Sequence, residues 1–231
     1  MPHLASDYDD NQDRWLTNVS VRKRFATTTW DTHQPTAGRI VAEGLRPVLD
    51  VGCGDGALHR ELPADWSWVG ADRSRAMLRR APKPAVLADA RRLPFPERTF
   101  GAVAMLWMLY HLPDPETAVA EAERVLRPGG LLIACTNSRH DSPELKHVHD
   151  VGPVSFDAEI AEEMVGRHFD EIEFDRWDGP YYHLPDGAAV RDYLVGRLMP
   201  RQEAKAAAER VDTPLDVTKR GVLLFARKVQ T

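Results

Sequence analysis

The stretch VLDVGCGDGALHREL, Val48–Leu62, joins an expected strand to an expected helix through a glycine-rich loop. Pro47–Val51 is short, apolar and β-branched, which predicts a buried strand, and Asp55–Leu62 predicts a helix. Glycines let the backbone turn tightly and let a ligand come close, and the start of a helix presents free N–H groups. The pattern predicts a nucleotide-type ligand, with a tight turn that binds nothing as the alternative.

The rest of the chain continues this alternation of strands and helices. Further strands are predicted at Ser67–Ala71, Ala85–Ala88, Gly101–Trp107, Leu131–Cys135, Glu171–Trp177 and Gly221–Lys228. Helices are predicted at Ser74–Arg80, from Asp114 to the RPGG stretch ending at Gly130, at Phe156–Phe169, near Ala188–Leu198 and near Gln202–Arg210. Alternation of this kind implies right-handed crossovers and a mostly parallel sheet, so we expect an α/β fold.

A length of 231 residues fits one domain, and we expect a single domain over residues 1–231. Residues 1–44 are expected to form a helical lid and residues 45–137 the cofactor-binding core. Residues 138–231 are expected to form a substrate-side half with a helical insertion at about 178–218. We place the lid and the insertion over the carboxyl ends of the strands, where open α/β sheets bind ligands.

Composition and net charge limit the binding partners and the cellular compartment that we expect for this protein. The formal net charge is −5, from 30 basic and 35 acidic residues, which disfavours a nucleic-acid partner. Cys53 and Cys135 do not form a disulfide framework. The N-terminus lacks a signal-peptide pattern, and the longest apolar run, Gly101–Tyr110, is too short to span a bilayer. We expect a cytoplasmic monomer or homodimer without a membrane or nucleic-acid partner.

Three acids accompany the first three expected strands. Asp50 precedes the glycine loop, where a second negative charge beside phosphates would be unfavourable but a cationic ligand would be stabilised. Asp72 follows the second strand and suits the hydroxyls of a ribose. Asp89 follows the third and can accept a hydrogen bond from an exocyclic amine such as that of adenine. Together they favour a cationic adenosine derivative over a dinucleotide.

Four ordered motifs over about Arg46–Thr136 carry a family resemblance. They are VLDVGCGDG (48–56), ADRS (71–74), LADARRLPF (87–95) and MLYHLPDPETAVAEAERVLRPGGLLIA (108–134), and RGVLLFARK (220–228) is similar to the last strand of the same family. The chain resembles the class I S-adenosylmethionine-dependent methyltransferases, in the type 11 or ubiquinone-biosynthesis-like branch that acts on small molecules. The resemblance implies a Rossmann-like seven-stranded, mostly parallel sheet of order 3-2-1-4-5-7-6. Its last strand would be antiparallel, with helices on both faces.

The resemblance also implies a cofactor, a reaction and a set of residues. The cofactor would be S-adenosylmethionine and the product S-adenosylhomocysteine, with the methyl group passing by direct in-line displacement to an oxygen, nitrogen or carbon atom of a small-molecule acceptor. The implied cofactor-binding residues are Asp50, Gly52, Cys53, Gly54, Gly56, Asp72, Arg73, Asp89, Ala90, Leu106 and Trp107. Asp50 and the loop would face the methionine part, Asp72 the ribose, and Asp89 the adenine.

His111 is the candidate base, because it follows the fourth expected strand and a histidine can take a proton near neutral pH. The alternative is a histidine that only orients its loop. Expected substrate-side residues are Tyr8, Trp15, Tyr110, His140, Tyr181 and Tyr182, each of which could instead be a core or surface residue. The histidines of segment 139–150 match no zinc-ligand spacing, so no metal is expected.

Other functions remain open at this point. Gly52, Gly54 and Ala57 satisfy the dinucleotide pattern G-x-G-x-x-G/A, so an NAD(P)-binding oxidoreductase is the main alternative. Asp50 and the LADA stretch disfavour it. An rRNA or tRNA methyltransferase and a non-catalytic cofactor-binding protein rank lower, because the chain is acidic and none of its motifs is degraded.

Overall fold

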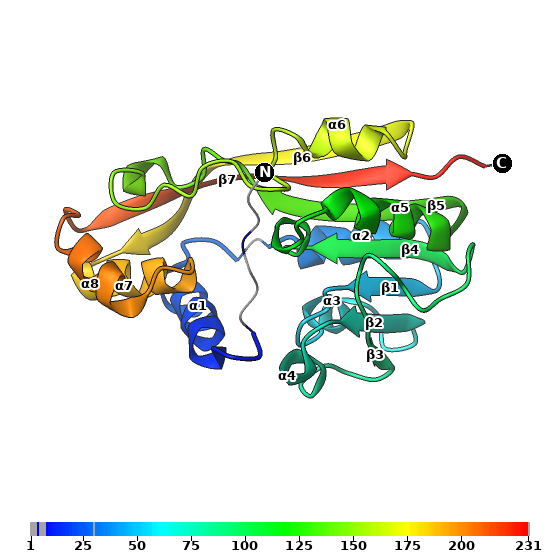
Figure 1. The fold of residues 1–231 in the computed structure, drawn as a ribbon, viewed down its shortest axis with the longest axis horizontal. Coiled ribbons are helices and arrows are strands. Elements are labelled where there is room, and N and C mark those ends of the chain that lie inside the picture. Colours follow the sequence, from blue (N-terminus) through cyan, green and yellow to red (C-terminus); the bar gives the residue numbers. More distant parts are fainter. Residues whose placement is uncertain (1–3, 5–7, 30, 231) are drawn as a thin grey trace.

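A computed structural model describes residues 4, 8–29 and 31–230, so the expected lid of residues 1–44 lies partly outside the described residues. One sheet has the order β3-β2-β1-β4-β5-β7-β6 (Figure 1). The strands are β1 (Val48–Val51), β2 (Trp68–Asp72), β3 (Ala85–Leu87), β4 (Phe100–Leu106), β5 (Leu126–Asn137), β6 (Glu171–Leu184) and β7 (Leu215–Arg227). β1 to β5 pair in parallel, and β7 is antiparallel to both β5 and β6. The predicted order and the antiparallel last strand are confirmed.

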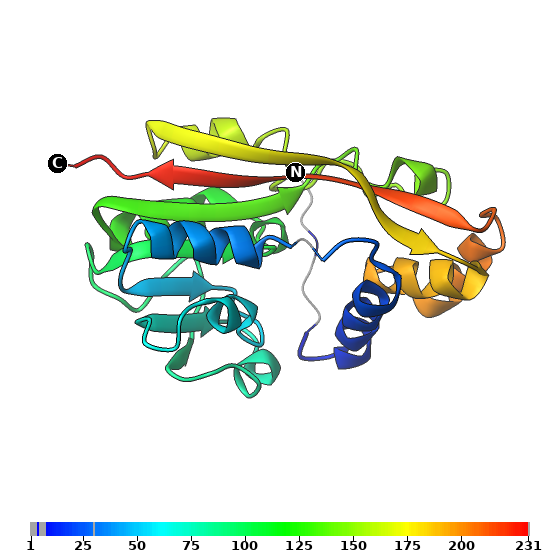
Figure 2. The same ribbon diagram turned by 180° about the vertical axis from the view of Figure 1, so that it is seen from behind.

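Helices cover both faces of this sheet, as Figures 1 and 2 show from opposite sides. The helices are α1 (Gln12–Phe25), α2 (His33–Ala42), α3 (Ala57–Glu61), α4 (Arg75–Leu78), α5 (Pro115–Val125), α6 (Ala161–Gly166), α7 (Gly187–Gly196) and α8 (Arg201–Ala208), with 3-10 turns η1 (Leu109–His111) and η2 (Pro143–Leu145). None of the helices in the described ranges is long and apolar enough to cross a membrane.

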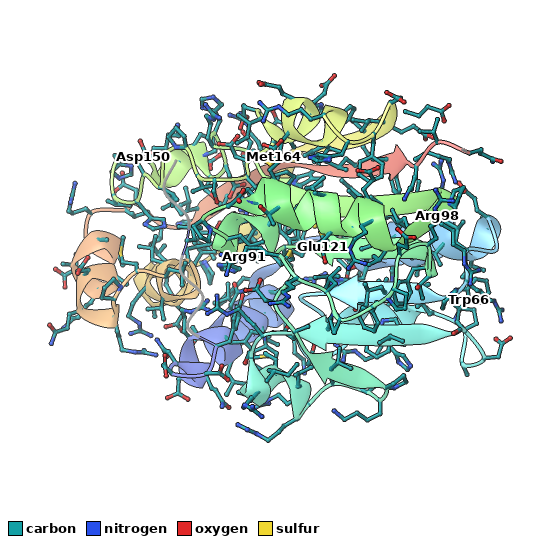
Figure 3. The ribbon with its side chains drawn as sticks, turned by 45° about the vertical axis from the view of Figure 1, so that its right-hand side comes forward. Trp66, Arg91, Arg98, Glu121, Asp150 and Met164 are labelled. Atoms are coloured by element: carbon teal, nitrogen blue, oxygen red, sulfur yellow. The ribbon has the colours of Figure 1, made fainter. Side chains whose placement is uncertain are left out.

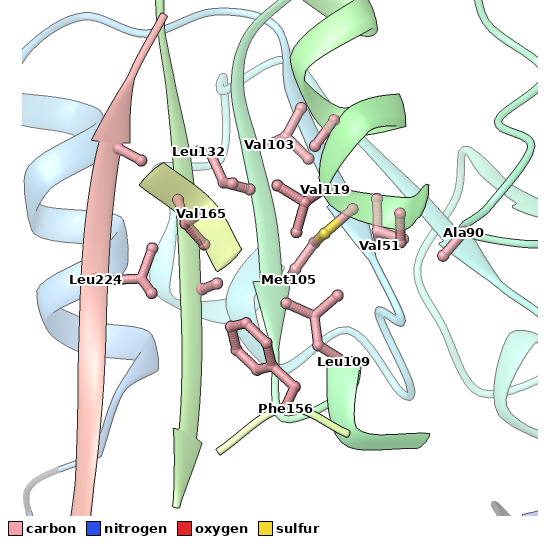
Figure 4. Packing of buried hydrophobic residues seen from close by; sticks show 14 of the residues in the cluster. Val51, Ala90, Val103, Met105, Leu109, Val119, Leu132, Phe156, Val165 and Leu224 are labelled. Atoms are coloured by element: carbon pink, nitrogen blue, oxygen red, sulfur yellow. The ribbon is translucent and has the colours of Figure 1, made fainter. Parts of the chain in front are cut away.

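The two faces of the sheet carry separate cores. On one face, Val119 of α5 and Val165 of α6 pack with Met105 and Leu132 (Figure 4). On the other, Ile40 of α2 packs with residues of α3, β1, β4, β5 and β7. Every residue of β4 is buried, which is the pattern of a strand covered on both faces.

Helix starts follow the expected capping residues. The side chain of Asp114 accepts from the N–H of Thr117, and Pro115 occupies the first turn of α5. Ser74 accepts from the N–H of Met77 at the start of α4. Figure 3 labels Arg91 of the β3–β4 connection and Glu121 of α5. The N–H of Leu93 in this connection donates a 2.8 Å hydrogen bond to Glu121.

β6 and β7 are longer than the sequence predicts. They pair from Glu171 and Arg227 to Leu184 and Leu215, with one register shift between Pro180 and Tyr182. The stretch from Asp178 to Pro180 has the composition of a turn, and its proline has no N–H to donate to a neighbouring strand. It is nevertheless part of β6, with the register shift directly after Pro180. The helical insertion is accordingly confined to α7 and α8, and the strand pair carries it beyond the rest of the sheet (Figures 1 and 2).

The other differences concern the helices. α6 begins at Ala161 rather than Phe156, because Phe156 is buried in the core and Asp157 is held by Arg139 in a turn. α1 packs against α7, and with it forms part of a third core, whereas α2 packs on the sheet. Of the described part of the expected lid, α1, the residues that follow it and the first residue of α2, His33, border the cavity, and the rest of α2 lies on the sheet.

Candidate active site

A cavity of about 900 Å³ opens at the carboxyl ends of the central strands. It is lined by the loop after β1, the ends of β2, β3 and β4, helix α1 and the extended parts of β6 and β7. Its volume lies at the upper end of the range of small-molecule sites, about 300–1,000 Å³. One cavity thus joins the expected cofactor side to the expected substrate side.

The glycine loop contributes bare backbone to this cavity. Gly52 and Gly54 have φ angles of +71° and +55°, a region that residues with side chains rarely adopt. A Cβ at Gly52 would lie 2.8 Å from Cβ of Met108, whereas one at Gly54 would meet nothing within 4 Å. Gly56 does not line the cavity; a Cβ there would collide with Pro82, so this glycine serves packing instead of the expected ligand contact.

Asp72 ties the loop to the end of β2. Its Oδ2 accepts a 2.9 Å hydrogen bond from the N–H of Gly54, and its Oδ1 accepts a 2.8 Å bond from the N–H of Ser74. Burial raises the pKa of Asp72. Each carboxylate oxygen has a second lone pair that can accept from a hydroxyl, so the geometry suits the expected ribose contact.

Asp89 and Ala90 also line the cavity, beyond the end of β3. Asp89 forms a 2.7 Å ion pair with Arg91, and this hydrogen-bonded guanidinium lowers the pKa of Asp89. The carboxylate is therefore ionised at neutral pH and can still accept from an amine. Its role toward adenine stays a prediction.

Asp50 lies beneath the loop and does not line the cavity, contrary to the expected direct contact. It is 3% exposed, and its Oδ2 has no hydrogen-bond partner among the described residues. Burial raises the pKa of Asp50 to about 7. Because it follows Leu49 and precedes Val51 on a fully buried strand, its side chain is enclosed by the core. Asp50 can influence a cation in the cavity only through its field.

Trp107 and Leu106 form the wall at the end of β4. Trp107 has a φ of +59°, and its indole Nε1 donates a 2.9 Å hydrogen bond to Oγ1 of Thr32. Its ring lies 5.8 Å from that of Trp177 on β6. This contact brings the cofactor-side wall and the aromatic residues of the substrate side together.

His111 is held by the segment before α1. Its Nδ1 lies 2.5 Å from the carbonyl oxygen of Leu4, whose own N–H donates to the carbonyl of Tyr110. A carbonyl can only accept, so Nδ1 carries the hydrogen and Nε2 is the basic nitrogen. Nε2 lies 3.3 Å from the hydroxyl of Tyr8, a cavity residue. The arrangement orients a base toward the cavity.

The same segment is anchored to the cofactor side. Oδ1 of Asp9 accepts from the Ser74 hydroxyl at 2.8 Å and from the Ala76 N–H at 2.9 Å. Leu4 and Tyr8 therefore contact His111, and Asp9 contacts the residues that follow β2. Sequence reasoning missed Asp9, and its neighbours give no pattern that would have identified it.

The structure brings most of the expected site residues together. Those that line the cavity are Gly52, Cys53, Gly54, Asp72, Arg73, Asp89, Ala90, Leu106, Trp107, His111, Tyr8, Trp15, Tyr110, Tyr181 and Tyr182. His140 does not. It is exposed, because Ser138 and Arg139 are fastened to Glu159 and Asp157 and turn the loop after β5 away from the cavity.

Two further cavity residues, Lys219 and Arg197, were not expected. Lys219 follows Val217 and precedes Gly221 on the buried face of β7, so strand alternation was a signal that could have found it. Arg197 follows α7 directly, and the sequence holds no comparable signal for it.

The fold and this cavity define a Rossmann-like domain of the methyltransferase type. Residues 49–134 match the sequence model of a family described as "Methyltransferase domain". This segment is similar to a methyltransferase domain, and the predicted resemblance to the class I S-adenosylmethionine-dependent methyltransferases is confirmed for it.

Curated relatives agree with this assignment. A demethylmenaquinone methyltransferase of Lactiplantibacillus plantarum is 37% identical over 116 residues, which are 44% of this chain and 49% of the relative. One of Streptomyces avermitilis is 29% identical over 141 residues, 58% of this chain and 60% of the relative. The chain thus spans about half the length of the curated relatives it matches.

Solved structures support the fold. The [4+2]-cyclase SpnF superposes with a TM-score of 0.61 at 18% identity, covering 99% of both chains. The YcgJ protein of Bacillus subtilis superposes with a TM-score of 0.58 at 16% identity, covering 80% of this chain and 92% of that one. At these identities the likeness concerns the fold alone.

Proposed function

We propose that this protein transfers a methyl group from S-adenosylmethionine to a small-molecule acceptor. The observation that carries the proposal is the single cavity that joins the glycine loop and Asp72 to His111 and the aromatic wall. A donor held at one end of such a cavity faces an acceptor held at the other, as an in-line displacement requires.

The donor site is built from residues that fit this cofactor. The open space beside Gly54 admits a ligand against the backbone, and Asp72 and Asp89 offer oxygens to its hydroxyls and its amine. When bound, S-adenosylmethionine supplies a methyl group on a positively charged sulfur. The carboxylates of Asp72 and Asp89 favour positive charge at this end of the cavity.

His111 is proposed as the base that removes a proton from the acceptor. The Leu4 carbonyl fixes the tautomer, and the Tyr8 hydroxyl lies between Nε2 and the cavity. Tyr8 would have to yield its hydrogen bond to the acceptor or relay the proton. An acceptor with an acidic O–H, N–H or C–H would need such a base, whereas an already ionised atom would not.

The acceptor is not carried over from the relatives. The family match ends at residue 134, before the elements β6, β7 and α7 that build the other end of the cavity. The name of these relatives therefore supports methyl transfer as the reaction, but it does not support demethylmenaquinone as the acceptor of this protein. We place the protein in the cytoplasm, which is supported by two buried free thiols, and infer a monomer or homodimer.

Calorimetry on the full chain tests the cofactor assignment. S-adenosylmethionine and S-adenosylhomocysteine should bind, and NAD should not. Incubation with methyl-labelled S-adenosylmethionine and panels of phenols, amines and carbon acids should then label an acceptor and release S-adenosylhomocysteine. Binding of NAD in place of the sulfonium cofactor would overturn the proposal, and cofactor binding without transfer to any panel would support a non-methylating use of the fold.

A further inference from the structure

The cations Arg197 and Lys219 line the cavity on other elements than the acids Asp72 and Asp89. Asp72 ends β2 and Asp89 follows β3, near one edge of the sheet, whereas Lys219 lies on β7, next to the other edge strand. Arg197, immediately after α7, lines the same end as Lys219. The acidic end belongs to the proposed cofactor site, which leaves the cationic end for the acceptor.

The cations at this end are incompletely neutralised. Lys219 is 6% exposed and forms an ion pair with Asp141. Asp141 also accepts a 2.8 Å hydrogen bond from the N–H of Arg220, so both of its oxygens are engaged. Across the described ranges, no carboxylate pairs with Arg197, and its buried Nε has no hydrogen-bond partner. Arg197, Lys219 and Asp141 together carry one net positive charge.

Arg197 is half-buried, and a guanidinium without an anion is unfavourable where one of its donors has left water without a new partner, as Nε has. Arg197 lies 5.0 Å from the ring centre of Tyr193, a cation–π contact that offsets only part of this cost. Burial and then the charge of Arg197 lower the pKa of Lys219 to about 8, so the two cations lie within each other's field. An anion bound between them would satisfy both.

Aromatic side chains surround the same end of the cavity. Trp177, Tyr181 and Tyr182 line it, with the two tyrosine rings 4.9 Å apart. Flat aromatic faces of this kind suit a planar ligand. The fork of a guanidinium matches the two oxygens of a carboxylate, and one net positive charge balances a monoanion better than a phosphate.

We propose that the methyl acceptor is an aromatic carboxylate, held by Arg197 and Lys219 while the aromatic walls contact its ring. This inference rests on the proposed function, because it names the substrate class of the same site. Arg197 and Lys219 act in it as specificity-determining residues, and the reacting atom lies elsewhere on the acceptor.

Calorimetry on the full chain saturated with S-adenosylhomocysteine tests the proposal, with benzoate as the probe and benzamide and phenyl phosphate as comparisons. Benzoate should bind at least about tenfold more tightly than benzamide, as expected for charge-assisted hydrogen bonds. Arg197→Gln should weaken benzoate at least about tenfold and leave benzamide unchanged. Arg220→Gln is the matched control: Arg220 follows Lys219, pairs with Asp178 outside the cavity, and should leave benzoate affinity unchanged.

The proposal is overturned if benzoate does not bind, if benzamide binds equally well, if phenyl phosphate binds more tightly, or if Arg197→Gln leaves benzoate affinity unchanged. Should Arg197→Gln fail to fold, Lys219→Gln takes its place, and the comparison of probes on the unaltered protein stands by itself. Binding of S-adenosylhomocysteine without benzoate would remove only this inference. Failure to bind S-adenosylhomocysteine would remove the proposed function.

Discussion

The backbone N–H of Gly54 donates a 2.9 Å hydrogen bond to Oδ2 of Asp72, which ties the glycine loop after β1 to the end of β2. The other oxygen of the same carboxylate accepts from the N–H of Ser74 at 2.8 Å. Asp72 therefore shapes the cofactor end of the cavity and offers its remaining lone pairs to a ligand.

Asp72→Ala should weaken binding of S-adenosylmethionine severely while the fold stays intact. Loss of hydrogen bonds to a charged group costs about 1.5–3 kcal/mol each, which corresponds to roughly 10- to 100-fold in affinity. Calorimetry measures the affinity and circular dichroism verifies the fold. Asp65→Ala, an exposed carboxylate paired with Arg46, is the control and should bind normally. Near-normal affinity in Asp72→Ala would remove the ribose assignment.

His111→Ala should slow methyl transfer more than it weakens cofactor binding. General-base catalysis contributes about 10²–10⁴-fold, so kcat should fall by a factor in that range if the acceptor atom carries a proton. Single-turnover assays measure the transfer step, and calorimetry measures cofactor affinity. His140→Ala, a histidine outside the cavity wall, should leave both unchanged. An unaltered kcat in His111→Ala would eliminate it as the base.

Two glycine variants distinguish the effect of a side chain on the stability of the loop from its effect on cofactor binding. Gly54→Ala should reduce cofactor affinity and destabilise the fold by only about 1–2 kcal/mol, because its φ is +55° but its Cβ would stand in open space. Gly52→Ala adds a clash 2.8 Å from Met108 Cβ and should cost more stability. Denaturant unfolding and calorimetry measure the two effects.

Gly187→Ala is the control for that comparison, since it begins α7 without contacts within 4 Å at its Cβ. It should keep cofactor affinity and be neutral or slightly stabilising, as alanine in a helix usually is relative to glycine. Equal loss of affinity in Gly54→Ala and Gly187→Ala would contradict the assignment of the loop.

Asp50 should make the stability of the ligand-free protein depend on pH. Burial raises the pKa of Asp50 from 3.8 to about 7, so between these values the folded state keeps a proton that the unfolded state has released. Its contribution to stability is therefore fully present below about pH 4 and is lost as the pH rises through 7. One pKa unit corresponds to about 1.4 kcal/mol, so the free energy of unfolding should fall by a few kcal/mol.

Asp50→Asn removes the titrating group while keeping its shape. Urea unfolding at several values between pH 5 and 8 should show a flatter profile for this variant and greater stability than the unaltered protein at pH 8. A shallow slope of the same sign should remain, because burial raises the pKa of Asp72 as well. Parallel profiles for the two proteins would show that Asp50 does not titrate in this range.

Local patterns predicted most of the cofactor half. Gly52 and Gly54, the acids Asp72 and Asp89, and the caps Ser74 and Asp114 lie where the sequence predicted them, because strand periodicity, capping and left-handed backbone depend on neighbouring residues. The predictions that the structure corrects depend on burial. Asp50 was expected at the ligand and lies in the core, and Gly56 was expected at the ligand and packs on Pro82.

Local sequence patterns predicted less of the substrate-side half of the protein. The turn-like stretch from Asp178 to Pro180 concealed the length of β6, whose course is set by pairing with β7 some forty residues away. His140 was expected in the cavity because of its position after β5, and ion pairs with Asp157 and Glu159 turn its loop elsewhere.

The sequence by itself determined the α/β class and the loop that approaches a ligand, since both follow from short-range pattern, and its family resemblance supplied the strand order. Only the tertiary structure decided how His111 meets Leu4 and Tyr8, and which cations share a cavity with the acids of β2 and β3. Those contacts join residues far apart in the chain. Their geometry follows from the packing of the whole sheet, which no local pattern encodes.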